Sequence, residues 1–131
     1  SFMNKFQKNP ILGHITTFSG HPVIAAAGFK SLSIILKERL SEKTLDKERL
    51  FRSLLKHPYI QEIRGKGLMI ALILKNEKLA NQLVLKSLDN GLILFWLLYE
   101  KKAVRITPPL NISKTEIKKG CKIILSILNS I

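Results

Sequence analysis

Arg105 is the side chain of this sequence whose setting is best suited to holding a carboxylate. It stands between Val104 and Ile106 in a short alternating run, and Pro108 and Pro109 follow. The alternation predicts a strand, which the prolines end because neither can donate a backbone hydrogen bond. A guanidinium with a fixed direction can grip a carboxylate through two parallel hydrogen bonds. A structural ion pair would leave the same pattern, so both interpretations stay open at this point.

A hydroxyl-rich segment earlier in the chain could hold an anion. It runs from Gly13 to Pro22 and includes Thr16, Thr17 and Ser19. Pro22 predicts the first turn of a helix, where the missing amide costs nothing. Hydroxyls, free loop amides and the positive end of a helix dipole together favour negative charge at such a position. An ordinary capped loop fits these residues equally well.

Metal and phosphate-loop chemistry are not predicted. The histidines His14, His21 and His57 lack a metal-binding spacing, and no carboxylate cluster accompanies them. Lys66 stands between two glycines but does not match the Gly-x-x-x-x-Gly-Lys-Ser/Thr pattern of phosphate loops. The single cysteine, Cys121, excludes an internal disulfide and is expected in the core, which agrees with a cytoplasmic protein.

The chain of 131 residues is strongly basic, with a net charge of +13. Such a charge favours nucleic acid as a partner, because phosphates attract Lys and Arg. The basic residues are spread along the sequence, however, and mostly fall on the predicted polar sides of helices, where they keep a protein soluble. No apolar run approaches the roughly 20 residues of a membrane span. We therefore expect neither specific nucleic-acid binding nor a membrane segment.

Hydrophobic periodicity and turn residues predict alternating helices and strands. Asn76 begins one helix as its cap, and Ser113 and Glu116 have the spacing of a capping box at the start of another. Helices are expected from residue 22, over 44–56, after 76 and after 113, and strands at 92–96 and 103–107. Residues 59–64 and 68–74 are expected to form two strands or one long bent strand, joined at residues 65–67 by a glycine-flanked kink or bulge. This order predicts a small sheet covered by helices, in the α/β or α+β class.

The apolar positions of these elements predict which sides are buried. The run from 92 to 98 is expected to be a core strand, and Leu88 is expected to face inward from its helix. The first helix is expected to bury the apolar stripe Ala25, Phe29, Leu32, Leu36 and Leu40.

Three segments in this order resemble the C-terminal part of class-III pyridoxal-phosphate aminotransferases of the ornithine and acetylornithine type. They are residues 14–22 followed by three alanines, residues 64–68 (Arg-Gly-Lys-Gly-Leu) and residues 105–110 (Arg-Ile-Thr-Pro-Pro-Leu). The resemblance covers nearly the whole chain. It implies a small, mainly antiparallel sheet covered by helices, the C-terminal small domain of fold type I. Residues 1–21 would belong to the large-domain or interface region, and residues 22–131 to the connecting helix and the small domain.

The resemblance also implies roles for individual residues. Thr17, with Thr16 at the neighbouring hydroxyl position, would reach the phosphate of pyridoxal phosphate in the partner subunit of a homodimer. Arg105 would contact the substrate carboxylate or pair with a gating glutamate. The Schiff-base lysine would lie upstream, so no catalytic residue is expected in this segment, and the segment alone is expected to be inactive. Since position 1 is not methionine, we expect a cut from a longer chain.

The implied function is transfer of an amino group from an ornithine-like donor to 2-oxoglutarate in the cytoplasm, in amino-acid metabolism such as arginine biosynthesis. Two alternatives remain open: a small basic nucleic-acid-binding domain, and a non-catalytic interaction domain with an aminotransferase-like fold.

Overall fold

The computed structural model describes residue 4 and residues 16–131, and the chain divides into two compact units, Ser1–Glu38 and Arg39–Ile131. The first unit contains helix α1, Pro22–Lys37. Pro22 opens the helix as predicted. The helix stops short of Leu40, and Arg39 follows with a left-handed φ of 51°. The assignment of residues 1–21 to a large-domain or interface region stays a prediction.

The predicted burial of the α1 stripe is wrong for Ala25, Phe29, Leu32 and Leu36, because no residue of α1 is buried. Phe29, for example, is 74% exposed. Apart from residue 4, the described part of this unit consists of α1 with the residues directly beside it, and this part contains no second helix or strand that could cover an apolar helix side. Leu40 is buried, but it belongs to the second unit.

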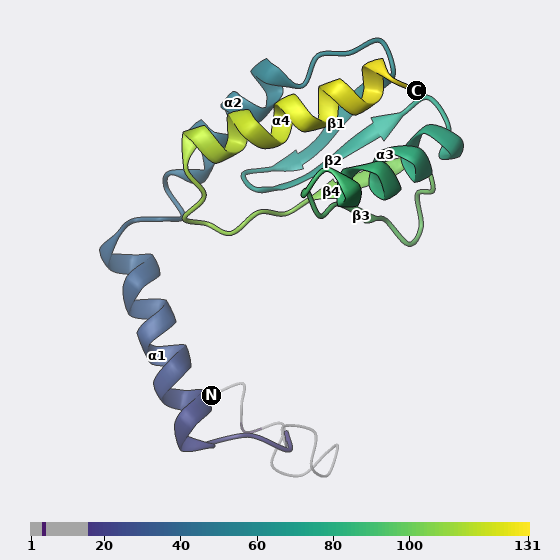
Figure 1. Ribbon diagram of the computed structural model, residues 1–131. Coiled ribbons are helices and arrows are strands. Elements are labelled where there is room, and N and C mark those ends of the chain that lie inside the picture. The colour runs from purple at the N-terminus through teal and green to yellow at the C-terminus, as the bar shows by residue number, and fades with distance from the viewer. Residues whose placement is uncertain (1–3, 5–15) are drawn as a thin grey trace. The chain divides into compact units, whose positions relative to one another are not determined.

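The second unit is a four-stranded antiparallel sheet with three helices, which confirms the predicted fold class (Figure 1). The strand order is β1-β2-β4-β3. The strands are β1 Ile60–Lys66, β2 Met69–Leu74, β3 Phe95–Trp96 and β4 Ala103–Ile106, and the helices are α2 Thr44–Leu54, α3 Glu77–Asp89 and α4 Lys114–Asn129.

One face of the sheet forms the core. Alternate residues of β2 (Ile70, Leu72, Leu74) and of β4 (Val104, Ile106) are buried in a single cluster with residues of α2, α3 and α4. Since side chains alternate between the faces of a strand, the three helices lie against the same face. Figure 1 shows α2 and α4 running beside each other over the sheet.

Local sequence signals explain how the helices of this unit begin. The Asn76 side chain accepts a hydrogen bond from the Leu79 N–H at the start of α3. Ser113 and Glu116 form the predicted capping box at the start of α4, each side chain accepting from the other residue's backbone N–H. Each such cap stabilises a helix by about 1 kcal/mol.

The apolar run from 92 to 98 is not a core strand, which corrects the prediction. Only Phe95 and Trp96 pair with β4, at the edge of the sheet, and the following Leu98 is 90% exposed. Leu94 alone in this run is buried. The predicted inward position of Leu88 is also wrong: Ser87, four residues after Leu83, takes that place, and its hydroxyl donates to the Val84 carbonyl.

The turn between β1 and β2 depends on two glycines. Gly67 has a φ of +61°, and Gly65 has a φ of +111° with the Met69 carbonyl oxygen 2.0 Å from where a β-carbon would stand. Only glycine tolerates both conditions at position 65. Glycine is therefore required at position 65 of this tight hairpin. The join between the two strands is this turn, and the predicted kink or bulge is not found there.

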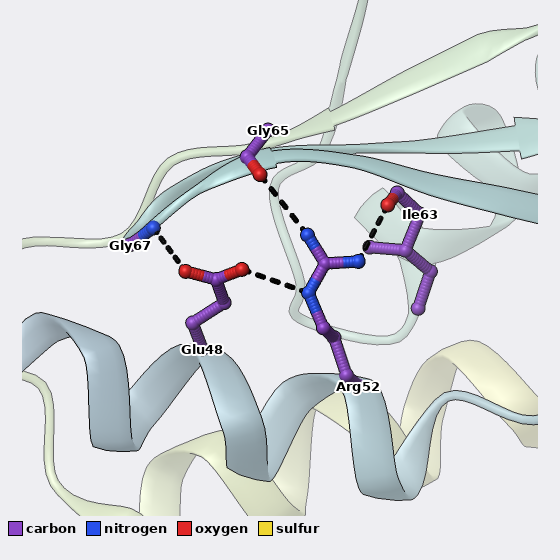
Figure 2. A network of polar contacts seen from close by, with 5 residues as sticks. All are labelled: Glu48, Arg52, Ile63, Gly65 and Gly67. Atoms are coloured by element: carbon purple, nitrogen blue, oxygen red, sulfur yellow. Dashed lines mark hydrogen bonds and ion pairs between the residues drawn. The ribbon is translucent and has the colours of Figure 1, made fainter.

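An ionic network fastens this hairpin to α2 (Figure 2). Arg52 donates to a Glu48 carboxylate oxygen at 2.8 Å, to the Ile63 carbonyl at 2.6 Å and to the Gly65 carbonyl at 3.0 Å. The other Glu48 oxygen accepts from the Gly67 N–H. This backbone hydrogen bond, with Arg52 as the second cause, lowers the pKa of Glu48. We call these residues the hairpin clamp.

Candidate functional site

Arg105 lies in a row of four residues that crosses the sheet. Arg64 of β1 stands opposite Ala71 of β2, Ala71 opposite Arg105, and Arg105 opposite Phe95 of β3. Directly opposite residues of antiparallel strands project to the same side. The row, which we call the arginine row, therefore lies on the face away from the helices. The strand position predicted for Arg105 is confirmed.

The Arg105 guanidinium rests over an aromatic ring. Its Cζ atom is 5.2 Å from the centroid of the Phe95 ring, within the range of a cation–π interaction. Among the residues that the structure describes, no carboxylate oxygen lies within ion-pair distance of this side chain. Arg105 is thus an exposed cation held by a ring, with its N–H groups available to a ligand.

Arg64, at the other end of the row, is already engaged. Its Nε donates to a Glu62 carboxylate oxygen at 2.7 Å, and both side chains are about half exposed. It precedes the glycine turn held by the hairpin clamp. These contacts suit a structural role.

In the described part of the chain Arg105 lines three hollows: one of about 480 Å³ that also includes Phe51 and Ile124, and a smaller and a larger one. The smaller, of about 170 Å³, also has Arg64, Ala71 and Leu97 in its wall. The larger, of about 810 Å³, is formed by residues 95–100 with Arg105. Their walls are mainly apolar, and charges attract more strongly where water is partly excluded. A carboxylate entering the smaller or the larger hollow would meet a cation in surroundings that favour an ion pair.

Thr16 and Thr17 are exposed in the turn that precedes α1. The Ser19 N–H donates to the Thr16 carbonyl at 3.2 Å, and the His21 N–H to the Phe18 carbonyl at 3.2 Å. His21 is the N-cap residue of α1, and no side chain caps the helix. The hydroxyls and the first amides of α1 are therefore near each other in sequence and exposed. The earlier residues of the predicted segment, including His14, lie outside the described residues.

The two candidate regions belong to different units of the chain. Thr16 and Thr17 stand side by side in one turn of the first unit, and Arg105 is in the second. Across residue 4 and residues 16–131, no group of three His, Cys, Asp or Glu side chains could hold a metal ion. None of the helices in this part of the chain has the length and apolarity that crossing a bilayer requires.

Sequence reasoning missed Phe95 as the partner of Arg105. The two residues are ten positions apart, and their pairing depends on the register of β3 against β4. No local signal fixes that register, because residues 97–102 form an irregular connection and not a tight hairpin. An aromatic residue one strand earlier was the only available hint.

Cys121 is buried in α4 as predicted, and this burial raises the pKa of its thiol to about 11. A thiol that is protonated and buried is a poor nucleophile. The cysteine therefore contributes to packing and takes no part in the candidate site.

Comparison with known proteins relates this chain to one enzyme family. Residues 2–128 match the family model described as Aminotransferase class-III. The acetylornithine aminotransferase of Caldanaerobacter subterraneus subsp. tengcongensis is 34% identical over 123 residues, which cover 90% of this chain and 30% of that protein. The ornithine aminotransferase of Plasmodium chabaudi chabaudi is 38% identical over 120 residues, covering 86% of this chain and 28% of that protein.

A solved structure agrees with these relatives. The acetylornithine aminotransferase from Elizabethkingia anophelis superposes with a TM-score of 0.80 at 29% identity, covering 90% of this chain and 32% of that one. The chain thus spans about a third of the length of the enzymes it matches. These matches favour the enzyme prediction over the nucleic-acid-binding alternative. The chain belongs to the class-III aminotransferase family.

Proposed function

We propose that this chain is the C-terminal segment of a pyridoxal-phosphate-dependent aminotransferase, acting as a cytoplasmic homodimer. In this proposal, the enzyme moves an amino group from an ornithine-like donor to 2-oxoglutarate, and Arg105 binds a substrate carboxylate. Similarity to an acetylornithine and an ornithine aminotransferase supports the substrate class.

The observation that carries the proposal is the state of Arg105. The other arginines of the described residues, Arg39, Arg49, Arg52 and Arg64, each have a carboxylate partner. Arg105 instead has a ring beneath it and no carboxylate within ion-pair distance among the described residues. Its fork of N–H donors matches the two oxygens of a carboxylate.

The turn before α1 fits the phosphate of the cofactor. A phosphate accepts hydrogen bonds only, and the turn offers the exposed hydroxyls of Thr16 and Thr17 beside a helix start without a side-chain cap. We assign these two hydroxyls to the phosphate. When bound, pyridoxal phosphate would supply the electron sink for amino-group transfer.

The role of this chain in the reaction would be binding and orientation. Arg105 would fix the substrate through its carboxylate, so that the reacting amino or carbonyl group is presented in one direction. The apolar walls beside Arg105 would exclude water from this ion pair. The rigid strand β4, held on both sides by β2 and β3, keeps the guanidinium in place.

Substitution of Arg105 by lysine in the active enzyme tests this proposal. Arg105→Lys keeps the charge and loses the fork, so kcat/KM for 2-oxoglutarate should fall at least about tenfold, equal to about 1.4 kcal/mol of transition-state stabilisation. Propanal is 2-oxoglutarate with hydrogens in place of both carboxylates, and the kcat/KM for propanal should fall much less.

The matched control is Arg49→Lys, since Arg49 forms an exposed ion pair with Asp46 on α2. This variant should keep the kcat/KM of the parent for both acceptors. If Arg105→Lys affects 2-oxoglutarate and propanal equally, Arg105 does not bind a carboxylate and this part of the proposal is wrong.

A further inference from the structure

We propose that Phe95 is a positioning residue that aims the Arg105 guanidinium at the substrate carboxylate. This inference rests on the function proposed for Arg105. Its starting point is the cross-strand pair itself: Phe95 is directly opposite Arg105 in the register of β3 and β4. The guanidinium carbon lies over the ring at 5.2 Å from its centroid.

The two residues next to Phe95 in the sequence hold its ring in place. Leu94, the preceding residue, is buried in the core cluster. Trp96, the following residue, donates from its indole Nε1 to the Asn81 side chain on α3 at 2.8 Å. The Phe95 and Trp96 rings also meet edge to face, with centroids 6.0 Å apart. A two-residue edge strand would otherwise be a weak support, and these contacts tie it to the helix layer.

A ring orients a cation in a way that suits ligand binding. The negative face of the ring attracts the guanidinium without accepting its in-plane N–H groups. A carboxylate in the same place would direct the arginine equally well but would occupy the donors that the substrate needs. The neighbour of Arg105 on its other side, Ala71, has a methyl side chain that cannot accept a hydrogen bond from these groups. The arginine row therefore restrains the guanidinium and leaves its N–H groups available.

The experiment compares two acceptors in the active enzyme. It measures the ratio of kcat/KM for 2-oxoglutarate to kcat/KM for propanal, which cancels losses of folded enzyme because both values come from one preparation. Phe95→Leu keeps apolar volume and removes the ring, so the ratio should fall about fivefold, mainly through a higher KM for 2-oxoglutarate. Phe95→Tyr restores a ring face and should return the ratio to within about twofold of the parent.

Tyr59→Leu is the matched control, because it removes a ring from beneath another cation. The Lys75 ammonium lies 5.5 Å from the Tyr59 centroid at the far end of the sheet from Arg105. The ratio should not change in this variant.

The outcomes separate this inference from the proposed function. If Arg105→Lys leaves the ratio unchanged, the carboxylate role of Arg105 fails, and the role of Phe95 fails with it. If Arg105→Lys lowers the ratio and Phe95→Leu does not, only the positioning role is overturned. A loss in Phe95→Leu that Phe95→Tyr does not repair would also overturn it, because the ring face would then not be the cause.

Discussion

The hairpin clamp and the arginine row each place an arginine next to the same sheet, but the two arginines differ in how many of their hydrogen-bond donors are occupied. All three guanidinium nitrogens of Arg52 donate hydrogen bonds within the chain, to the Glu48 carboxylate and to the carbonyls of Ile63 and Gly65 (Figure 2). Arg105 has a ring beneath it and no hydrogen-bond acceptor of this kind among the described residues. A saturated arginine stabilises a fold, whereas one with available donors can bind a ligand.

This difference gives the two arginines different expected consequences on substitution. Loss of Arg52 would leave two partly buried groups without this partner: the Glu48 carboxylate, whose side chain is only 15% exposed, and the Ile63 carbonyl. Unsatisfied groups of that kind are expensive to bury. Loss of Arg105 would leave nothing unpaired within the described residues.

The largest expected effect on stability is that of Gly65→Ala, which would break the turn that the clamp holds. The new β-carbon would stand 2.0 Å from the Met69 carbonyl oxygen at a φ of +111°. Urea unfolding should show a loss of about 3 kcal/mol or more in the free energy of unfolding.

Gly91→Ala is the matched control for this effect. Its φ is +72°, but no atom lies within 4 Å of the added carbon. This variant should lower the free energy of unfolding by only about 1 kcal/mol, because of backbone strain. Equal losses in the two variants would show that the close approach of Met69 to Gly65 does not matter.

A second prediction compares the two arginines directly. Arg52→Met should lower the free energy of unfolding by about 2 to 3 kcal/mol, because it breaks a partly buried charge network. Arg105→Met should lower it by about 1 kcal/mol or less, the worth of an exposed cation–π contact. Urea unfolding of both variants measures the difference.

Arg49→Met serves as the reference for an exposed ion pair, since Arg49 and Asp46 are both more than two-thirds exposed. This substitution should change the free energy of unfolding by about 1 kcal/mol or less. An Arg105→Met variant as unstable as Arg52→Met would contradict the comparison and make Arg105 a structural residue.

The sequence was sufficient where a signal is local. The Ser113–Glu116 spacing predicted the start of α4, and Asn76 predicted the start of α3. Apolar alternation around Arg105 predicted its strand. Caps and alternation depend on neighbours within a few residues, so no knowledge of the tertiary fold is needed.

The sequence was insufficient where the outcome depends on distant partners. The run from 92 to 98 is as apolar as a core strand, yet most of it is exposed at the sheet edge because only Phe95 and Trp96 pair with β4. Composition cannot distinguish a central strand from an edge strand. The same non-local register concealed the pairing of Phe95 with Arg105, and the contacts of Arg52 with the hairpin.

The smallest expected effect is the dependence of the hairpin clamp on pH. The Gly67 N–H, followed by Arg52, lowers the pKa of Glu48 in the folded state. A carboxyl whose pKa is lower in the folded than in the unfolded state contributes stability above its unfolded pKa, about 4.3 for glutamate. That contribution should be lost as the pH falls from about 5 through the folded-state pKa. Glu48→Gln removes the titrating group and should make the free energy of unfolding depend less steeply on pH in this window.

Glu116 also contributes stability that is lost as the pH falls, because the Ser113 hydroxyl and then the Ser113 backbone N–H lower its pKa in the capping box. Glu116→Gln should therefore also make the free energy of unfolding depend less steeply on pH. The Glu48→Gln, Glu116→Gln double variant should reduce this steepness more than either single variant. Arg105→Met should leave the steepness unchanged, since no carboxylate of the described residues pairs with that arginine. If Glu48→Gln keeps the full steepness of the parent while Arg105→Met reduces it, Arg105 has a carboxylate partner in the folded protein. The contrast between a saturated and an available arginine would then not hold.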